Sequence, residues 1–511
     1  MKKCLALLLL ICTVLGGCSL GNQAYLPTGD GLDATVSTKP PSITPEQTEQ
    51  KLTLGYDPDS EVNPYRATDL NNRLLCSLLY QSLFTVDRDY TVSPLLCKNY
   101  TVSKDMQTYI FYLEEATFSD GSVLTALDVV TSLLVAMESP VYSGRLTNVR
   151  DISVTDEGAV RIDLKTPYEN FPILLDIPIV KSSDATRDWP LGTGPYYKDD
   201  ALIGIRLVRR GDWWCDYYVA ATASVIGLLE VDSKTTIRDD FEAGTVGILC
   251  ADPGSDSHVD VRCDYELWGC ENGIFLYLAC SEKSKTFSDP AVRAVLTYAI
   301  DRDLLVSNFY GDFARSATLP ASPDSPYYDQ RLAQQYGYNA EKCRDMLLKA
   351  SPLDMDITLL VNKADSRRVR VARKVAQMLE DVGFTVKLSI LSGTSYNTAL
   401  SKGNYDLHLG QTKLSANMDL SAFFNPKGAL NFGGMSDAAT FALCQEALAN
   451  AGNYYTLYQK VLADAMLCPI LFRSYAVYTQ RGLFTELAPT RDNIFYYETE
   501  KTMADALLSN Q

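Results

Sequence analysis

The sequence is short of histidine and of the motifs that mark hydrolytic active sites. Its 511 residues include two histidines, His258 and His408, and contain neither a GxSxG nor an HExxH motif. A Ser-His-Asp triad or a zinc hydrolase is therefore a poor fit. Paired carboxylates of the glycosidase kind stay open among 63 Asp and Glu residues, although solvated surface acids explain these adequately. We expect no enzyme, no metal site and no cofactor, and a partly buried structural role for His408.

Positive charge and long apolar segments are also scarce. The 46 Lys and Arg residues are outnumbered by 63 Asp and Glu, which gives a formal net charge of −17. Such an acidic chain does not attract nucleic acid or anionic lipid electrostatically, so we expect neither as a partner. After the N-terminus no apolar run approaches the ~20 residues that a membrane-spanning helix needs.

The first fifty residues predict a leader and a tether. Lys2 and Lys3 precede an apolar run over residues 5–15, which is typical of a signal peptide and too short to span a bilayer. Leu-Gly-Gly-Cys at 15–18 resembles a bacterial lipobox, which implies a signal peptide over 1–17 and lipid on Cys18. The alternative is a plain secretory leader with an incidental cysteine. Residues 18–50, rich in Gly, Pro, Ser and Thr, predict a flexible tether.

The cysteine pattern leaves the redox state open. An even number of cysteines outside the cell permits disulfides, and Cys263 and Cys270 could bridge locally. Buried free thiols are the alternative. No CxxC pair or zinc-module spacing occurs. Ten of the thirteen cysteines lie in the part expected to fold: Cys76, Cys97, Cys215, Cys250, Cys263, Cys270, Cys280, Cys343, Cys444 and Cys468.

The stretch FSDGSVLTALDVVTSLLVA, residues 118–136, predicts a tight turn followed by a well-started helix. Asp120 and Gly121 supply turn chemistry, because Asp bonds its own backbone and Gly permits positive φ. Thr125 and Asp128 have the spacing of a capping box, in which each side chain bonds the other residue's backbone amide. Apolar residues then follow at helical spacing.

Later segments predict repeated α/β units. Residues 366–381 predict a helix that Gly383 ends, and residues 384–390 alternate as a strand. Asp289 and Pro290 predict the start of a helix whose apolar stripe continues to residue 300, and Asp301 starts another. Such repetition favours two α/β lobes with a cleft between them.

Several blocks of the sequence follow one another in a recognisable order. The blocks are Asn-Pro-Tyr at 63–65, residues 78–121, GTGPYY at 192–197, residues 287–305, YNAEKCRDML at 338–347 and GNYDLHLG at 403–410. Through this ordered set, rather than through any single block, the chain resembles the family 5 extracellular solute-binding proteins, the oligopeptide, dipeptide and nickel receptors of ABC importers.

The resemblance implies an α/β fold of the two-lobed periplasmic-binding-protein type II kind with an extra inserted domain. Domain I would be discontinuous and the other two continuous. Chain crossings between the lobes would act as hinges, and the lobes would close over a ligand. The implied ranges are 51–84, 185–268 and 472–511 for domain I, 85–184 for the inserted domain II, and 269–471 for domain III.

The resemblance also implies where a solute would bind. Peptide-binding relatives pair an extended ligand with the strand segment after the Tyr-Asp block, here residues 410–419. Relatives often carry a Trp near its start and an Asp that binds the peptide amine, where this chain has Thr412 and Ser415. Either Asp419 takes that role in a shifted register or the solute differs. The implied ligand residues are Asn71, Asn72, Arg73, Tyr142, Tyr396, Gln411, Thr412, Lys413, Ser415, Asn417 and Asp419.

The function implied is a monomeric, lipid-anchored receptor on the outer side of the cell membrane. It would capture an oligopeptide or dipeptide and deliver it to the permease subunits of an ABC transporter. A metal chelate such as a nickel complex is the alternative solute. Two alternative functions are a secreted hydrolase on a two-lobed scaffold and a solute receptor for a sensor system.

Overall fold

The computed structural model describes residues 51–200, 204–215, 221–231, 234–255, 258, 260–352, 354–484 and 487–495. The predicted signal peptide, the predicted lipid-bearing Cys18 and the tether lie outside these residues. Over the described ranges, no helix combines the length and the apolar character needed to cross a membrane.

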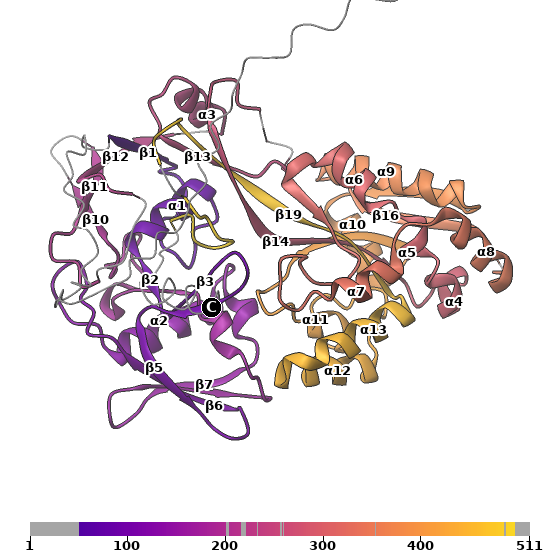
Figure 1. Ribbon diagram of the computed structural model, residues 1–511, viewed down its shortest axis with the longest axis horizontal. Helices are drawn as coiled ribbons and strands as arrows, with labels where there is room; N and C mark the ends of the chain where they lie inside the picture. The colour runs from indigo at the N-terminus through magenta and orange to yellow at the C-terminus, as the bar shows by residue number, and fades with distance from the viewer. Residues whose placement is uncertain are drawn as a thin grey trace, which may run out of the picture. The chain divides into compact units, whose positions relative to one another are not determined.

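A mixed sheet of eleven strands organises the described residues (Figure 1). The order is β10-β11-β12-β1-β13-β19-β14-β18-β16-β17, and β15 pairs with β19 beside this path. The pairs of β1 with β12 and β13, and of β16 with β17 and β18, are parallel. The strands are β1 (Leu52–Tyr56), β10 (Tyr196–Asp200), β11 (Ile205–Arg209), β12 (Val225–Glu230), β13 (Ile248–Ala251), β14 (Glu266–Cys280), β15 (Ala314–Ser316), β16 (Asp356–Asn362), β17 (Thr385–Leu391), β18 (Leu407–Lys413) and β19 (Leu467–Thr479).

Two long antiparallel strands, β14 and β19, connect the two ends of this sheet (Figure 1). One end of β19 pairs with β13, and the second half of β14 pairs with β18. The N-terminal strands and the strands β16 to β18 are therefore joined through this pair. The predicted domain boundaries at 268 and 471 fall inside β14 and β19, and the three-domain division stays a prediction.

Helices cover the sheet and complete two main hydrophobic cores. One core is formed by residues of α1, of the predicted domain II (85–184) and of the helices α11 to α13. The other is formed by residues of α4, α5 and α9 and the strands beneath them. The helices are α1 (Leu70–Leu79), α2 (Ala126–Glu138), α3 (Lys234–Glu242), α4 (Pro290–Arg293), α5 (Leu296–Ala299), α6 (Arg302–Phe309), α7 (Gln330–Ala333), α8 (Ala340–Ala350), α9 (Ser366–Asp381), α10 (Gly393–Lys402), α11 (Ser421–Phe424), α12 (Ala438–Ala449) and α13 (Tyr454–Asp464).

A four-stranded antiparallel sheet in the order β5-β6-β8-β7 and the helix α2 lie within the residues predicted as domain II. The capping box of α2 is confirmed: the Thr125 amide donates to Asp128 Oδ2 at 2.9 Å, and the reciprocal bond is present. The strands outside the eleven-stranded sheet are β2 (Gln81–Ser82), β3 (Phe84–Val86), β4 (Val92–Pro94), β5 (Cys97–Val102), β6 (Thr108–Leu113), β7 (Val149–Val154), β8 (Val160–Leu164) and β9 (Pro178–Ile179).

The predicted α/β units are confirmed with one correction. The helix α9 and the strand β17 occupy the expected residues, and the Asp289 side chain caps α4 by accepting from the Ala291 amide at 2.8 Å. The single helix expected up to residue 300 is wrong. It is divided into α4 and α5, because the Val295 amide bonds the Val292 carbonyl three residues back instead of continuing the α-helical ladder.

The glycines of the GTGPYY block allow a loop to pass directly against the end of α1. The Gly194 amide donates to the Leu79 carbonyl at 3.0 Å. A Cβ at Gly192 would lie 2.1 Å from that oxygen. We expect Gly192→Ala to lower the free energy of unfolding by about 1–3 kcal/mol, because the obstructing atom is rigid backbone. Thermal unfolding measures the loss.

Gly211→Ala is the matched control for this substitution. A Cβ at Gly211 has no neighbouring atom within 4 Å and its φ is not positive. The control should unfold within a degree or so of the wild-type protein, since surface changes usually stay within ~0.5 kcal/mol. Equal melting temperatures for the two variants would refute the close-approach explanation.

Candidate functional site

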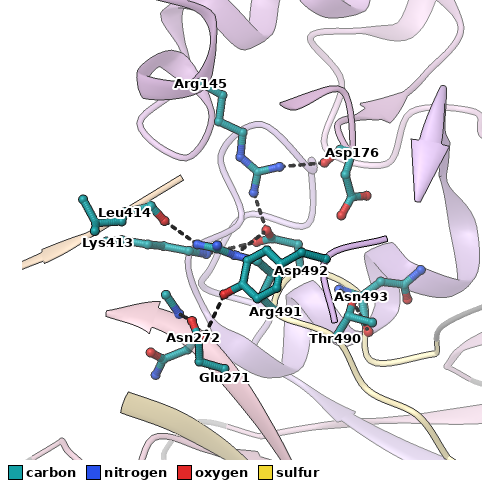
Figure 2. A network of polar contacts seen from close by, with 12 residues as sticks. Arg145, Asp176, Glu271, Asn272, Lys413, Leu414, Thr490, Arg491, Asp492 and Asn493 are labelled. Carbon is teal, nitrogen blue, oxygen red and sulfur yellow. Dashed lines mark hydrogen bonds and ion pairs between the residues drawn. The ribbon is translucent and has the colours of Figure 1, made fainter. Parts of the chain in front are cut away.

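Three of the predicted ligand residues meet around a carboxylate that the sequence analysis did not select. Arg73 lies in α1, Tyr142 follows α2, and Lys413 ends β18. The carboxylate belongs to Asp492, in the C-terminal segment 487–495. Four segments that are distant in sequence therefore converge on one point, which we call the Asp492 cluster: Arg73, Arg145, Lys413, Arg491 and Asp492. Figure 2 shows Arg145, Lys413 and Arg491 around Asp492.

Asp492 is the anionic centre of this cluster. Its side chain is only 4 % exposed, and its Oδ1 accepts from Arg73 Nη2 and Lys413 Nζ, each at 3.0 Å. Its Oδ2 accepts from Arg145 and lies 3.5 Å from Arg491 Nε. Charge-assisted bonds of this kind are the stronger ones in proteins. One buried carboxylate thus contacts four cationic side chains.

The segment 487–495 is itself held in place by bonds to several parts of the chain. Arg491 donates to the Leu414 carbonyl just after β18, and Arg88 Nε donates to the Pro489 carbonyl at 3.1 Å. The Thr490 amide donates to the Asn493 carbonyl at 2.7 Å, which closes a turn around Asp492. These bonds aim the Asp492 carboxylate at the cations (Figure 2).

A glycine in β14 makes room for Arg491. Gly273 has a φ of +73°, and a Cβ there would lie 2.0 Å from Arg491 Nη2. The neighbouring Glu271 accepts from the Gly273 amide at 2.8 Å and from the Tyr90 hydroxyl at 2.6 Å. Glu271 therefore holds Gly273 in the backbone conformation that leaves room for the Arg491 guanidinium.

The electrostatics of the cluster are dominated by its cations. Burial alone would raise the pKa of Asp492, but Arg145, Lys413, Arg491 and Arg73 together hold it well below its usual value. Burial, aided by the three guanidinium groups, lowers the pKa of Lys413 to about 7 even though Asp492 opposes the shift. About a third of the Lys413 side chain is exposed, so solvent also screens this group.

Asp176 lies at the edge of the cluster without neutralising it. Its backbone carbonyl, not its carboxylate, accepts from Arg145 Nη1 at 2.9 Å (Figure 2). Burial, reinforced by the charge of Asp492, raises the pKa of Asp176 to about 7. A carboxyl that is partly protonated at neutral pH adds little negative charge here.

The strand β18 leaves part of one edge free beside the cluster. It pairs with β14 from Leu407 to Lys413, whereas β16 pairs with it only at Leu407 and His408. Among the described residues, no strand pairs with the second edge from 409 to 413. Gly410 is needed in this stretch, because a Cβ there would lie 2.5 Å from the Tyr277 ring. An extended chain can add to such an edge through main-chain hydrogen bonds.

Asn71 and Gln411 lie near a second set of polar contacts, which centres on Arg473 and Asp252. Asn71 lines a cavity of about 320 Å³ with Asp252 and His258, and the Asn71 Oδ1 and His258 Nδ1 atoms are buried without a hydrogen bond. Gln411 accepts from Arg473 Nη1 at 3.3 Å, and Arg473 also pairs with Asp252. The cavity and β18 are thus linked through the Arg473 side chain.

Two of the predicted ligand residues are engaged inside the protein. Asn72 is fully buried and donates from Nδ2 to the carbonyls of Asp57 and Ser60, each at 3.0 Å. It therefore holds the loop between β1 and α1. The Tyr396 hydroxyl bonds His408 Nε2 at 2.7 Å within a separate small apolar cluster. Neither side chain is among those that meet at Asp492.

The remaining predicted ligand residues of the segment 410–419 are half-buried or buried. Thr412 is half-buried in β18 opposite Phe275. Asp419 Oδ1 accepts from the Ser421 amide at 2.8 Å at the start of α11, and Asn417 Oδ1 lies 3.4 Å from the Asp419 amide. Ser415 is half-buried, and its carbonyl accepts from the Met418 amide at 3.0 Å. Asp419 thus already has a structural hydrogen bond where a peptide amine was expected.

The histidines and cysteines of the described residues form no metal-binding group. The ten cysteines considered for disulfides are all free thiols, and nine of them are buried. Burial, together with the nearby Arg368, lowers the pKa of His408 to about 3. A neutral, hydrogen-bonded His408 agrees with the structural role expected from the sequence.

His408 should make the protein less stable as the pH falls. Its folded-state pKa lies below its unfolded value of about 6.5, so the unfolded chain binds an extra proton between those values. Stability is fully present above pH 6.5 and decreases toward pH 3, by up to about 1.4 kcal/mol per pH unit. We expect His408→Gln to show a shallower decline in melting temperature from pH 6.5 to 4.5. Parallel declines for both proteins would contradict this.

Sequence reasoning missed Arg145, Arg491 and Asp492. Arg145 lies three residues after the selected Tyr142, and its guanidinium carbon is 5.1 Å from the centre of the Tyr142 ring. Arg491 and Asp492 lie in a stretch without helical or strand periodicity. No local pattern could have identified them, because their partners are distant in sequence: Lys413 lies 79 residues and Arg145 lies 347 residues from Asp492.

Comparisons with known proteins agree with this architecture. The curated relatives include the glutathione-binding protein GsiB of Escherichia coli strain K12, which is 26% identical over 358 residues, 65% of this chain and 67% of that protein. GsiB of Salmonella typhi is 25% identical over 355 residues, with the same coverage of each chain. These relatives are solute-binding proteins rather than enzymes.

Solved structures show the same fold. The nickel ABC transporter protein of Bacillus halodurans matches with a TM-score of 0.72 at 17% identity, covering 89% of this chain and 99% of that one. The ABC transporter substrate-binding protein CtaP of Listeria monocytogenes matches with a TM-score of 0.70 at 19% identity, covering 88% and 98%. The predicted α/β fold of the periplasmic-binding-protein type II kind is therefore confirmed.

A family-level match covers two thirds of the sequence. The profile described as bacterial extracellular solute-binding proteins, family 5 Middle, matches residues 91–431. This range contains α2, β14, β18 and the helices packed on them. The chain therefore belongs to the family 5 bacterial extracellular solute-binding proteins.

Proposed function

We propose that this protein is the lipid-anchored extracellular receptor of an ABC importer and that it delivers an oligopeptide or dipeptide to membrane permease subunits. Its family binds solutes outside the cell. The lipobox-like sequence before Cys18 supports an anchor on the membrane. In this account the protein acts as a monomer and releases its solute chemically unchanged.

The observation that carries the proposal is the convergence of predicted ligand residues. Arg73, Tyr142 and Lys413 come from three distant segments and surround one polar centre. Lys413 also ends β18, whose second edge from 409 to 413 pairs with no strand of the described residues. A peptide that pairs with this edge would place its polar end groups near the cluster.

Binding of a peptide-sized solute is supported by the groups available. Main-chain groups on β18 and buried polar atoms such as Asn71 Oδ1 suit amide groups. The relatives named for glutathione are consistent with a short peptide.

Ligand-dependent thermal stabilisation tests the proposal. The purified protein is mixed with dipeptides, tripeptides, glutathione and nickel–histidine complexes, and each mixture is melted. A true solute at about a hundredfold excess over its Kd should stabilise the folded state by about 2.7 kcal/mol and raise the melting temperature by degrees.

Product analysis completes this experiment and separates a receptor from a hydrolase. Mass spectrometry of each stabilising mixture should return the solute intact. Cleaved product would favour the hydrolase, and a library in which no compound shifts the melting temperature would contradict peptide capture.

A further inference from the structure

The Asp492 cluster carries more positive than negative charge. Arg73, Arg145, Arg491 and Lys413 all contact the single Asp492 carboxylate. Glu271 offsets part of the charge of Arg491, and burial raises the pKa of Asp176 to about 7. Four cationic side chains therefore face fewer full negative charges. Buried cations in excess of their counter-charges are costly for a folded protein unless a further anion joins them.

One of these cations has unused binding capacity. Arg491 Nη1 is buried and makes no hydrogen bond, and Nε has only the 3.5 Å contact with Asp492. A guanidinium presents its donors in a fixed fork that matches carboxylate and phosphate oxygens. The site therefore offers donors that the protein's own groups do not satisfy.

The space between Arg73, Tyr142 and Asp492 is too small for an added anion. The cavity that these residues line with Asp176 and Asn493 has a volume of about 30 Å³, enough for a water molecule. Arg491 also lines a separate cavity of about 430 Å³. A carboxylate or phosphate can bond Arg73 and Arg145 together only by taking the place of Asp492. Asp492 lies in a segment without helix or strand, so its displacement breaks no sheet or helix.

We propose that the Asp492 carboxylate substitutes internally for an anionic group of the solute, and that a carboxylate or phosphate of the solute exchanges with it on Arg73, Arg145 and Lys413. The inference rests on the proposed function, because it names the chemistry of the solute. A solute without a negative charge would leave Asp492 in place.

Anion binding to the purified full chain tests the exchange. Succinate and inorganic phosphate are titrated at constant ionic strength into the wild-type protein and Asp492→Asn, a variant that keeps the side-chain shape and removes the competing charge. We expect Asp492→Asn to bind at least one anion about tenfold more tightly, a change of about 1.4 kcal/mol. Comparing the two anions distinguishes a carboxylate from a phosphate.

Two further variants separate a specific site from general charge effects. Asp264→Asn also removes one negative charge, but the Asp264 side chain is 74% exposed and pairs only with the exposed Arg481. It should bind both anions as the wild-type protein does. Adding Lys413→Met to Asp492→Asn should weaken the gained affinity about tenfold, a change of about 1.4 kcal/mol.

Proton uptake gives a readout that a purely structural lysine would not change. In Asp492→Asn, Lys413 has lost the carboxylate that opposes the lowering of its pKa, so succinate binding to this variant at pH 7 should raise that pKa and take up protons. Calorimetry in two buffers of different ionisation enthalpy measures this uptake. It should disappear when Lys413→Met is added to Asp492→Asn.

Equal anion affinity in Asp492→Asn and the wild-type protein, including no binding to either, would overturn the inference. If Asp492→Asn does not fold, Lys413→Met alone decides: it should bind succinate or phosphate more weakly than the wild-type protein, and no difference overturns the exchange. Solute capture is tested separately. Peptides that bind regardless of charge would leave the receptor function standing and refute the anion exchange alone.

Discussion

Asp492→Ala should destabilise the protein by about 3–5 kcal/mol, because it leaves buried cations without their counter-charge. Arg73, Arg145 and Lys413 each lose a bond to the same carboxylate. The repulsion among them then adds to the cost of burying them. Thermal unfolding at pH 7 measures the loss as a lower melting temperature.

The pH dependence of this deficit checks its electrostatic origin. The pKa of Asp492 is held well below its usual value, so its contribution is fully present above about pH 3.8 and is lost as the pH falls through the folded-state pKa. The difference in stability between wild type and Asp492→Ala should narrow in strong acid, below about pH 3.8, where Asp492 itself becomes protonated.

A control variant, Asp264→Ala, tests whether the loss of stability is specific to the Asp492 cluster. Asp264→Ala removes an exposed ion pair and should change stability by less than about 1 kcal/mol. If Asp492→Ala were no more destabilising than this control, Asp492 would not hold the four segments together as its contacts indicate.

Arg302→Met should be comparably destabilising for a different reason. Arg302 is 5% exposed and donates to the carbonyl oxygens of Pro469 at 2.8 Å and Thr297 at 2.9 Å, joining the start of α6 to β19. Methionine fills much of the volume but supplies no donor. Each buried acceptor left unsatisfied costs about 1–3 kcal/mol, so we expect a loss of about 3 kcal/mol or more in thermal unfolding.

Arg344→Met is the matched control for Arg302. Arg344 lies on the exposed face of α8 and makes one exposed bond to the Asp381 carbonyl at 3.1 Å. Its replacement should stay within about 0.5 kcal/mol of wild type. Similar melting temperatures for the two methionine variants would show that the Arg302 bonds do not stabilise this part of the fold.

Local features of the fold were predictable because their causes lie within a few residues. The capping box of Thr125 and Asp128, the helix α9 and the strand β17 each follow from short-range spacing. The close approach of Gly192 to α1 could be seen only in the structure. The order of the sequence blocks predicted the family 5 solute-binding proteins, and the profile match over residues 91–431 confirms this family.

The polar centre of the site was less predictable because it depends on long-range contacts. Arg73 and Tyr142 were selected through resemblance, yet Asp492, which bonds Arg73, lies more than four hundred residues later in the chain. Arg302 follows the predicted helix start at Asp301, and its burial against β19 was not predicted. Periodicity carries no information about such pairings, and a single sequence shows no covariation.

Native mass spectrometry of the protein purified from its producing cells tests the central claim most directly. The comparison is between wild type and a variant that carries Arg73→Gln, Arg145→Gln and Lys413→Gln together. We predict that wild type retains one small molecule per chain, that this molecule bears a negative charge, and that the variant loses it. An empty wild-type protein, or the same molecule retained equally by a folded variant, would contradict solute capture at the Asp492 cluster.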